Sequence, residues 1–307
     1  MRQIYAIGET VYDIIFREGI IVTGRPGGSM LNSAVSMGRA GLPVHFISEY
    51  GQDDIGAIVD SILLANSIDT RNVYRYTEGK TTVTIASLDK NNNAKYTFYR
   101  DAPKSRLGKA FPQLQKNDVL LFGSYYALAP EIRAKMVDFI CQAKNVGAFI
   151  VYDPNYRTAH LHELEQLKPR LIENMQMASV IKGSEDDFNL IFGAKTVEEA
   201  FENTSKYCKY LFYTMADKGV YFISEEQKIF VPSQKITPIS TIGAGDNFSA
   251  GIIYSLYNHR ILGDNLFELS DDSIKRIIET GIAFASDVCQ SFDNYVSANF
   301  ANSLFYK

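Results

Sequence analysis

A short stretch of this 307-residue chain combines small residues, a carboxylate and the start of a predicted helix. Gly243, Ala244 and Gly245 form a turn, and Asp246 follows it directly. Small residues let backbone N–H groups approach an anion, and the positive end of a helix dipole adds to the attraction. Beside a bound phosphate, a carboxylate has a task if it takes a proton from an attacking hydroxyl. On local chemistry alone, a tight turn with Asp246 as a helix N-cap explains the stretch equally well.

A second pair of glycines, Gly27 and Gly28, precedes another predicted helix. Paired glycines expose backbone amides, and Asn32 offers a donor and an acceptor to a polyol one turn inside that helix. Without a ligand, the same residues would form a plain turn and a packing helix. The two stretches together predict a site for a phosphate and a hydroxyl-bearing compound.

The elements that must position these residues alternate between short apolar strands and helices. Strands are predicted over residues 3–8, 44–47, 118–122, 148–153, 179–182 and 210–215. Helices are predicted over residues 31–40, 54–66, 130–145, 168–176, 196–206, 247–257 and 272–288. This alternation favours an α/β fold with a doubly wound, mainly parallel sheet covered on both faces.

Two stretches without intervening helices, residues 11–22 and 81–100, are predicted to form hairpins. The first turns near Glu18, and the second turns at residues 89–93. We expect them to build a small antiparallel sheet that projects from the core as a lid. An edge extension or a homodimer contact through the lid is the alternative role.

Length and composition indicate a globular protein. Hydrophobic residues make up 46% of the chain and charged residues 21%, and no low-complexity segment or linker interrupts it. We therefore expect a single domain over residues 1–307, with a lid subdomain formed by about residues 11–25 and 74–102.

Charge and cysteine content exclude several classes of protein. The net charge is -4 without a Lys/Arg block, so no nucleic acid or membrane surface is expected as a partner. The three cysteines have no metal-binding spacing, and no run approaches the ~20 apolar residues of a membrane span. These features predict a cytoplasmic protein.

Three motifs, two near the N-terminus and one toward the C-terminus, resemble those of one enzyme family. Gly-Ala-Gly-Asp-x-Phe-x-Ala-Gly at residues 243–251 resembles the C-terminal signature of the ribokinase-like, or PfkB, carbohydrate kinases. Residues 27–34 resemble the first signature, Gly-Gly-x-x-x-Asn-x-Ala, and residues 51–56 resemble the Gly-x-Asp-x-x-Gly element that follows it. The elements occur in family order over nearly the whole chain. The resemblance implies a ribokinase-like fold and ATP-dependent phosphorylation of a sugar hydroxyl.

The resemblance also implies roles for individual residues on the sugar side. Asp246 would be the catalytic base, and the amides of Gly243, Ala244 and Gly245 would stabilise charge on the transferred phosphoryl group. The residues implied to bind the sugar are Asp13, Gly27, Gly28, Asn32 and Arg100.

The nucleotide side departs from the family pattern at several positions. The residues implied to bind ATP are Lys182, Ser184, Thr214, Gly219 and Gly245, and Asp187 would contact Mg²⁺ through water. Ser184 and Asp187 occupy the positions of the family's Asn-x-x-Glu, and Ala216 replaces a glycine. The acidic cluster at residues 185–187 could instead cap a helix. Ser240 replaces an Asp that helps bind an activating monovalent cation, so potassium dependence is not implied.

The overall resemblance favours fructose as the substrate. Ketodeoxygluconate, ribose and a nucleoside are alternatives within the family. A carboxylated sugar would need a second cation near Arg100, for which Lys104 and Arg106 are candidates. A nucleoside would need an aromatic pocket, for which Phe98, Tyr99, Tyr125 and Tyr126 are candidates. Because the departures all fall on the nucleotide or ion side, a sugar-binding sensor with weakened catalysis is the alternative of another class.

Overall fold

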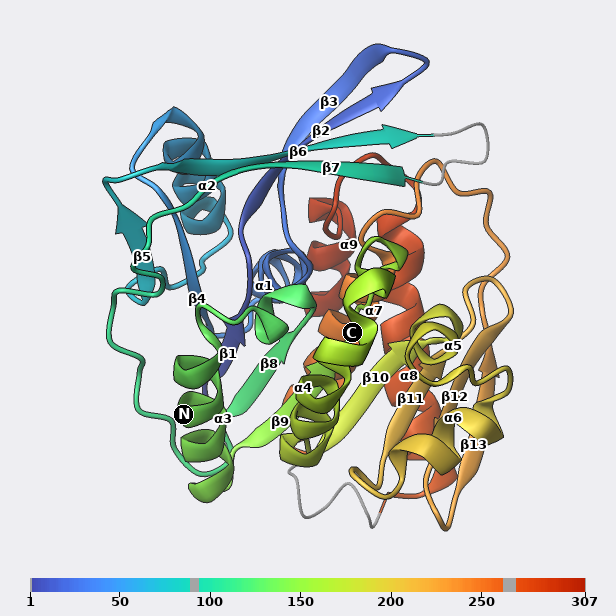
Figure 1. The fold of residues 1–307 in the computed structure, drawn as a ribbon. Coiled ribbons are helices and arrows are strands. Elements are labelled where there is room, and N and C mark those ends of the chain that lie inside the picture. Colours follow the sequence, from blue (N-terminus) through green and yellow to red (C-terminus); the bar gives the residue numbers. More distant parts are fainter. Residues whose placement is uncertain (1, 89–93, 262–268, 307) are drawn as a thin grey trace. The chain divides into compact units, whose positions relative to one another are not determined.

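The computed structural model describes residues 2–88, 94–261 and 269–306 (Figure 1). Its contacts divide the chain into two compact units. The N-terminal unit comprises residues 3–112, 236–250 and 284–307, and the central unit comprises residues 1–2, 113–235 and 251–283. Helices α7 (Ala244–Asn258) and α8 (Asp271–Val288) contribute residues to both units.

The central unit is built on six strands in the order β13-β12-β11-β10-β9-β8. Their bounds are β8 (Val119–Gly123), β9 (Phe149–Asp153), β10 (Val180–Ser184), β11 (Leu211–Thr214), β12 (Gly219–Ile223) and β13 (Lys228–Pro232). Strands β8 to β11 pair in parallel, whereas β12 and β13 are antiparallel. Every residue of β8 and β9 is buried, as expected for parallel strands covered on both faces.

Helices of the central unit connect these strands. They are η1 (Tyr125–Leu128), α3 (Arg133–Asn145), η2 (Thr158–Glu163), α4 (Leu164–Met177), α5 (Glu185–Phe192) and α6 (Val197–Thr204). The amphipathic pattern of α3 places Met136, Phe139 and Ile140 in the core, because residues three and four apart share one helix face.

The N-terminal unit contains three parallel strands in the order β1-β4-β5, namely β1 (Ile4–Ile7), β4 (Val44–Gly51) and β5 (Val73–Tyr76). Its helices are α1 (Ser29–Arg39), α2 (Asp54–Ala65), α9 (Ala298–Ser303) and η4 (Leu304–Tyr306). Helix α1 is almost entirely buried, including the polar residues Asn32, Ser33 and Ser36. Buried polar side chains need hydrogen-bond partners, and these three bond to residues of α7.

Four strands of the N-terminal unit form a separate sheet in the order β3-β2-β6-β7 (Figure 1), which we call the lid sheet. They are β2 (Val11–Arg17), β3 (Ile20–Gly27), β6 (Lys80–Leu88) and β7 (Ala94–Asp101). The two predicted hairpins are antiparallel, and β2 and β6 pair in parallel where the hairpins meet, so the lid sheet as a whole is mixed. Whether β2 and β6 pair in parallel depends on the direction in which each hairpin leaves the core. The sequences of the hairpins do not encode that direction.

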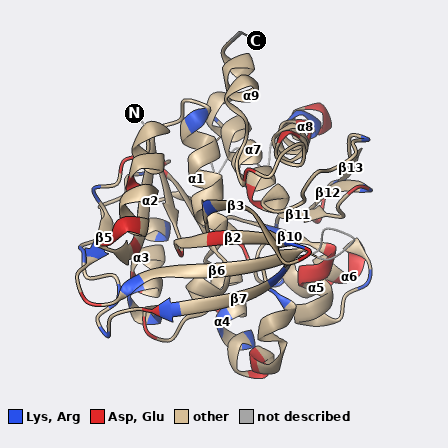
Figure 2. Cartoon of the chain, turned by 90° about the horizontal axis from the view of Figure 1, so that it is seen from above, with Lys and Arg blue, Asp and Glu red and all other residues tan. Residues whose placement is uncertain are grey.

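The predicted α/β architecture is confirmed, with six predicted strands and seven predicted helices found near their expected positions. The short elements β5, β12, β13, α5 and α9 were not predicted. The second hairpin's predicted turn, at residues 89–93, lies outside the described residues. Basic and acidic positions are interspersed along the chain (Figure 2). None of the described helices is long and apolar enough to cross a membrane.

Candidate active site

Asp246 lies in the first turn of α7, and two side chains of α1 hold its carboxylate. Ser29 Oγ donates to Asp246 Oδ1 at 2.6 Å, and Asn32 Nδ2 donates to Asp246 Oδ2 at 2.8 Å. Ser33 Oγ donates to the backbone carbonyl of Asp246 at 2.7 Å. The side chain of Asp246 is oriented by these bonds, with 7% of the residue exposed. The structure therefore brings together Asn32 and Asp246, which the sequence analysis assigned to one site.

The small-residue turn forms the start of α7. Gly243 has a φ of 79°, which favours glycine, and its carbonyl accepts from the N–H of Asn247 at 2.9 Å. A Cβ at Gly243 would lie 2.7 Å from the carbonyl oxygen of Asn294. The first N–H groups of a helix have no intrahelical acceptor, and that of Ala244 donates to Thr241 O over a long 3.3 Å. This geometry suits an anion at the helix N-terminus.

Asp13 lies on β2 and is 6% exposed. Gly27 leaves room for it, since a Cβ at Gly27 would lie 2.0 Å from Asp13 Oδ2. Asn294 Nδ2 donates to the same oxygen over 3.4 Å. Burial and the nearby carboxylate of Glu9 raise the pKa of Asp13 to about 7. Hydrogen bonds from the side chains of Asn294 and Thr84 partly oppose this rise, and a buried carboxylate can accept further bonds from a ligand.

Two buried amide oxygens lie beside these carboxylates. Oδ1 of Asn32 and Oδ1 of Asn294 have no hydrogen-bond partner among the described residues. Buried amide oxygens are normally satisfied, and a hydroxyl-rich ligand could donate to both. Gly28, the N-cap of α1, has a φ of 122°, and a Cβ there would lie 2.1 Å from the carbonyl oxygen of Glu9.

Arg100 lies on β7 of the lid sheet, and its guanidinium pairs with Glu9 at 3.2 Å. Its charged end also lies 4.6 Å from the ring centre of Phe98. Burial raises the pKa of Glu9, and the charge of Arg100 opposes that effect. Arg106 pairs in the same way with the buried carboxylate of Glu49. Both guanidinium groups therefore face carboxylates of the protein itself.

Four of the five residues predicted to bind the nucleotide, Lys182, Ser184, Thr214 and Gly219, lie in the central unit on neighbouring strands. The fifth, Gly245, lies in the N-terminal unit, at the start of α7. Ser184 ends β10 and is in register with Thr214, which ends the parallel strand β11. Gly219 begins β12, with a φ of 140°. Ser184, Thr214 and Gly219 therefore share the carboxyl-end region where α/β sheets bind ligands.

Ala216 lies in the turn between β11 and β12 and adopts a φ of 48°. Positive φ is the conformation that the glycine of the family motif would adopt without strain. The alanine therefore keeps the conformation of the turn at a local energetic cost.

Asp187 and Ser184 form a capping box at the start of α5. Asp187 Oδ2 accepts from Ser184 N at 2.7 Å and Ser184 Oγ at 2.6 Å, and its Oδ1 accepts from Tyr156 N at 2.6 Å. These bonds leave little room for a metal ion in direct contact, but they are compatible with a water-mediated contact through Oδ1. Among the described residues, no group of three or more His, Cys, Asp and Glu side chains could hold a metal ion.

Lys182, in the middle of β10, forms a buried ion pair with Asp153, the last residue of β9. The Nζ–Oδ2 distance is 2.9 Å, and the two side chains are 4% and 0% exposed. Its ammonium charge is thus matched by a protein carboxylate, and a buried pair of this kind costs several kcal/mol to break (~3–5).

Ser240 is buried, and its Oγ accepts from the N–H of Ile242 at 3.2 Å. A neutral hydroxyl stands where a carboxylate would contribute charge to a cation site. The position therefore lacks the strongest ligand that such an ion would use.

Sequence reasoning missed Ser29, Glu9, Asn247 and Asn294. Ser29 occupies a variable position of the Gly-Gly-x-x-x-Asn pattern, and a serine at the first position of a helix usually reads as a capping residue. Its contact with Asp246 spans 217 positions, and no local pattern encodes it.

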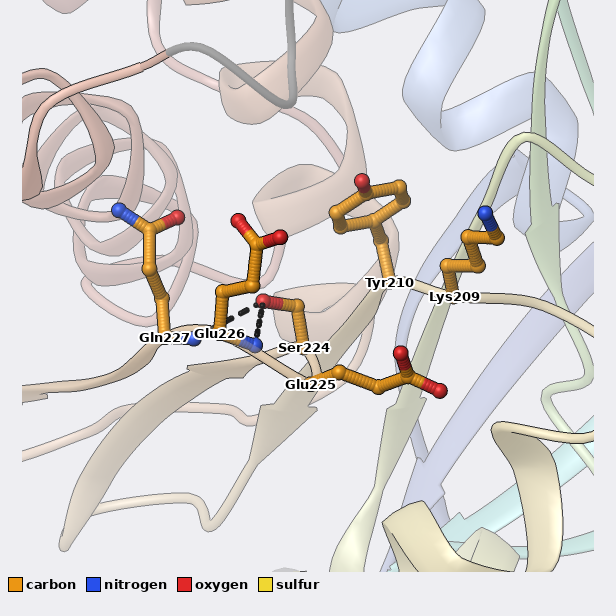
Figure 3. Close-up of a pocket in the computed structure, with 6 residues that line it drawn as sticks. All are labelled: Lys209, Tyr210, Ser224, Glu225, Glu226 and Gln227. Atoms are coloured by element: carbon orange, nitrogen blue, oxygen red, sulfur yellow. Dashed lines mark hydrogen bonds between the residues drawn. The ribbon is translucent and has the colours of Figure 1, made fainter.

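A small hollow in the central unit is lined by six residues, none of which is a predicted site residue (Figure 3). It is lined by Lys209, Tyr210, Ser224, Glu225, Glu226 and Gln227. Its volume of about 80 Å³ is well below that of a typical small-molecule site. We assign it no ligand.

Residues 1–298 match the model of the pfkB family carbohydrate kinases. The chain belongs to this family. A fructokinase from Vibrio alginolyticus is 25% identical over 262 residues, covering 84% of this chain and 85% of that protein. The protein is thus a PfkB carbohydrate kinase, a phosphotransferase.

Solved structures show the same fold. The fructokinase from Vibrio cholerae O395 with fructose, ADP and calcium ion bound has a TM-score of 0.86 at 21% identity, covering 100% of this chain and 98% of that one. A ribokinase from Thermotoga maritima has a TM-score of 0.74 at 18% identity, with both chains covered completely. The PfkB kinase described here therefore has the predicted ribokinase-like fold, and its family uses ATP with a divalent metal ion.

Proposed function

We propose that this kinase transfers the γ-phosphoryl group of ATP to a hydroxyl of fructose, with Asp246 as the base. The observation that carries the proposal is the Asp246 carboxylate, held by Ser29 and Asn32 at the N-terminus of α7. The curated fructokinase from Vibrio alginolyticus, 25% identical, supports fructose among the family's substrates.

In the proposed reaction, a sugar hydroxyl donates its proton to Asp246 as its oxygen attacks the γ-phosphorus. The bond from phosphorus to the bridging oxygen of ADP breaks, and the amides at Gly243, Ala244 and Gly245 stabilise the charge on the transferred group. Ser29 and Asn32 fix the base before the reaction, so little reorganisation is needed.

The polar groups of the N-terminal unit support a polyol as the acceptor. Asp13 accepts hydrogen bonds, and the buried amide oxygens of Asn32 and Asn294 can accept from ligand hydroxyls. Three acceptors in one region favour a compound with several hydroxyl groups. Gly27 and Gly28 allow the close packing that leaves these acceptors in place.

Charge pairing favours a neutral sugar over a carboxylated one. Arg100 pairs with Glu9 and Arg106 pairs with Glu49, so a sugar carboxylate would have to displace a protein carboxylate to gain a cation. For Glu49, whose side chain is 3% exposed, displacement would leave a buried charge without its partner, which is costly. We therefore favour fructose over ketodeoxygluconate.

On the nucleotide side, we propose that Thr214, Gly219 and the backbone at Ser184 contact ATP. Mg²⁺ would supply charge neutralisation to the ATP phosphates, with Asp187 contacting it through water. Because Ser240 contributes no carboxylate, we expect turnover to be the same in potassium and tetramethylammonium salts.

A substrate panel tests the proposed function. ATP consumption is measured with fructose, ribose, ketodeoxygluconate and adenosine at matched concentrations, and we expect the highest kcat/KM with fructose. Higher kcat/KM with another compound would reassign the substrate. No turnover with any compound, together with measurable sugar binding, would favour a sugar-binding sensor over an active kinase.

A further inference from the structure

Asn247 is fully buried on α7, directly after the proposed base, and all of its side-chain polar atoms are engaged. Its Nδ2 donates to the carbonyl oxygens of Gly243 and Asn294, both at 2.8 Å. Its Oδ1 accepts from the hydroxyl of Ser36 on α1. One amide thus joins the small-residue turn to two other segments of the N-terminal unit.

Ser36 extends this connection. Its Oγ also accepts from the backbone N–H of Val296 at 3.0 Å. The carbonyl of Asn294 and the N–H of Val296 are therefore both fixed by the same pair of side chains. Three segments distant in sequence, α1, the turn and residues 294–296, meet at Asn247.

The carbonyl of Gly243 matters because of the peptide group to which it belongs. The C=O of Gly243 and the N–H of Ala244 lie in one rigid plane, so fixing the oxygen fixes the direction of that N–H. Gly243 O accepts from Asn247 twice, from the backbone N–H at 2.9 Å and from Nδ2 at 2.8 Å. Glycine is otherwise the residue with the greatest conformational freedom.

We propose that Asn247 is a positioning residue for phosphoryl transfer, which holds the amides of the turn in the direction that the transition state requires. The inference rests on the proposed function, because it assigns a task to the same turn. Asn247 is fully buried, with protein partners for its side-chain amide. It acts through Gly243, and its absence should affect kcat more than the KM for the sugar, since Asp13 and Asn32 remain in place.

Two substitutions at Asn247 separate this role from general packing. Asn247→Ala removes both donors, whereas Asn247→Asp keeps the shape but directs an acceptor at two carbonyl oxygens. We expect kcat to fall about 10-fold to 100-fold in both variants, with the larger loss in Asn247→Asp and the sugar KM within about threefold. Ser36→Ala removes only the anchor of Oδ1, so a smaller loss of kcat is expected. Ser255→Ala, at another buried polar position of α7, is the matched control and should keep wild-type kcat.

Hydrogen exchange provides a readout that does not depend on turnover. Amides of residues 241–249 should exchange faster in Asn247→Ala and Ser36→Ala than in the wild type, whereas Ser255→Ala should leave them unchanged. Wild-type turnover with unchanged kcat in both Asn247 variants would overturn the positioning role and leave the proposed function intact. If the wild-type protein shows no turnover, that result counts against the proposed function. Unchanged hydrogen exchange in Asn247→Ala would overturn the positioning role of Asn247 whether or not the wild-type protein turns over.

Discussion

Replacing Asp13 by asparagine should change the pH dependence of stability in a direction that the structure fixes. Burial and the charge of Glu9 raise the pKa of Asp13 from 3.8 to about 7 in the folded protein. Each pKa unit corresponds to about 1.4 kcal/mol, so a rise of about 3 units amounts to about 4 kcal/mol. This is an upper limit, because relaxation and water penetration reduce the cost of a buried charge.

The sign follows from proton binding. The folded state holds the proton on Asp13 more tightly than the unfolded state, so the contribution of Asp13 to stability is complete below pH 4. It is lost as the pH rises through about 7, where the buried carboxylate becomes charged. Asparagine cannot ionise, so Asp13→Asn should gain stability relative to the wild type between pH 4 and 7, by as much as about 4 kcal/mol.

Urea unfolding followed by circular dichroism at pH 4.5, 6, 7 and 8 would measure this difference. Asp53→Asn is the matched control. Burial raises the pKa of Asp53, but hydrogen bonds from Gly56 and Thr81 lower it by more, so the net shift of the pKa is downward. Its folded pKa lies below the unfolded value, so Asp53→Asn should lose stability relative to the wild type above pH 4. A stability difference for Asp13→Asn that is constant or shrinks with rising pH would refute the reasoning. Asp13→Asn should also raise the KM for the sugar, since it removes a carboxylate that accepts hydrogen bonds.

Three further predictions concern the turns and the lid sheet. Ala216→Gly should raise the free energy of unfolding by up to about 1 kcal/mol, because glycine adopts the φ of 48° without strain; a fall in stability measured by urea unfolding would contradict this. Gly27→Ala should raise the sugar KM at least about 10-fold, because its Cβ would lie 2.0 Å from Asp13 Oδ2 and displace that carboxylate; an unchanged KM would count against the role of Asp13. On the two edge strands of the lid sheet, Ile20 and Ile21 of β3 are 71% and 60% exposed, and Tyr99 of β7 is 58% exposed. We therefore expect these edges to pair in a homodimer, and a monomeric mass in sedimentation at assay concentration would argue against it.

The strands and helices that carry the site were predictable because their patterns are local. β8 and β9 are continuous apolar runs, and α2 begins at an Asp53 cap whose side chain accepts from Gly56 N. The hairpin β12–β13 was missed because β13 alternates exposed and buried residues over only five positions, which periodicity alone cannot separate from a loop. The parallel pairing of β2 with β6 depends on long-range assembly of the two hairpins.

Within the site, residues with a motif were predictable and their supporting partners were not. Asp246 and Asn32 belong to recognisable patterns, whereas Ser29 and Asn294 act through contacts that span more than 200 positions. Asn247 reads as an ordinary helix residue until its two carbonyl partners are known. One interpretation of the acidic residues 185–187 was that they cap a helix. Asp187 does so, because it completes a capping box with Ser184.

The measurement that tests the central claim most directly is the rate of ATP-dependent fructose phosphorylation by Asp246→Asn. Asparagine keeps the shape of the side chain but cannot accept the proton of the sugar hydroxyl. We predict that kcat falls at least about 100-fold while fructose binding, measured by calorimetry, is retained. A kcat within a few-fold of the wild type would contradict Asp246 as the base, and with it the mechanism proposed for this kinase.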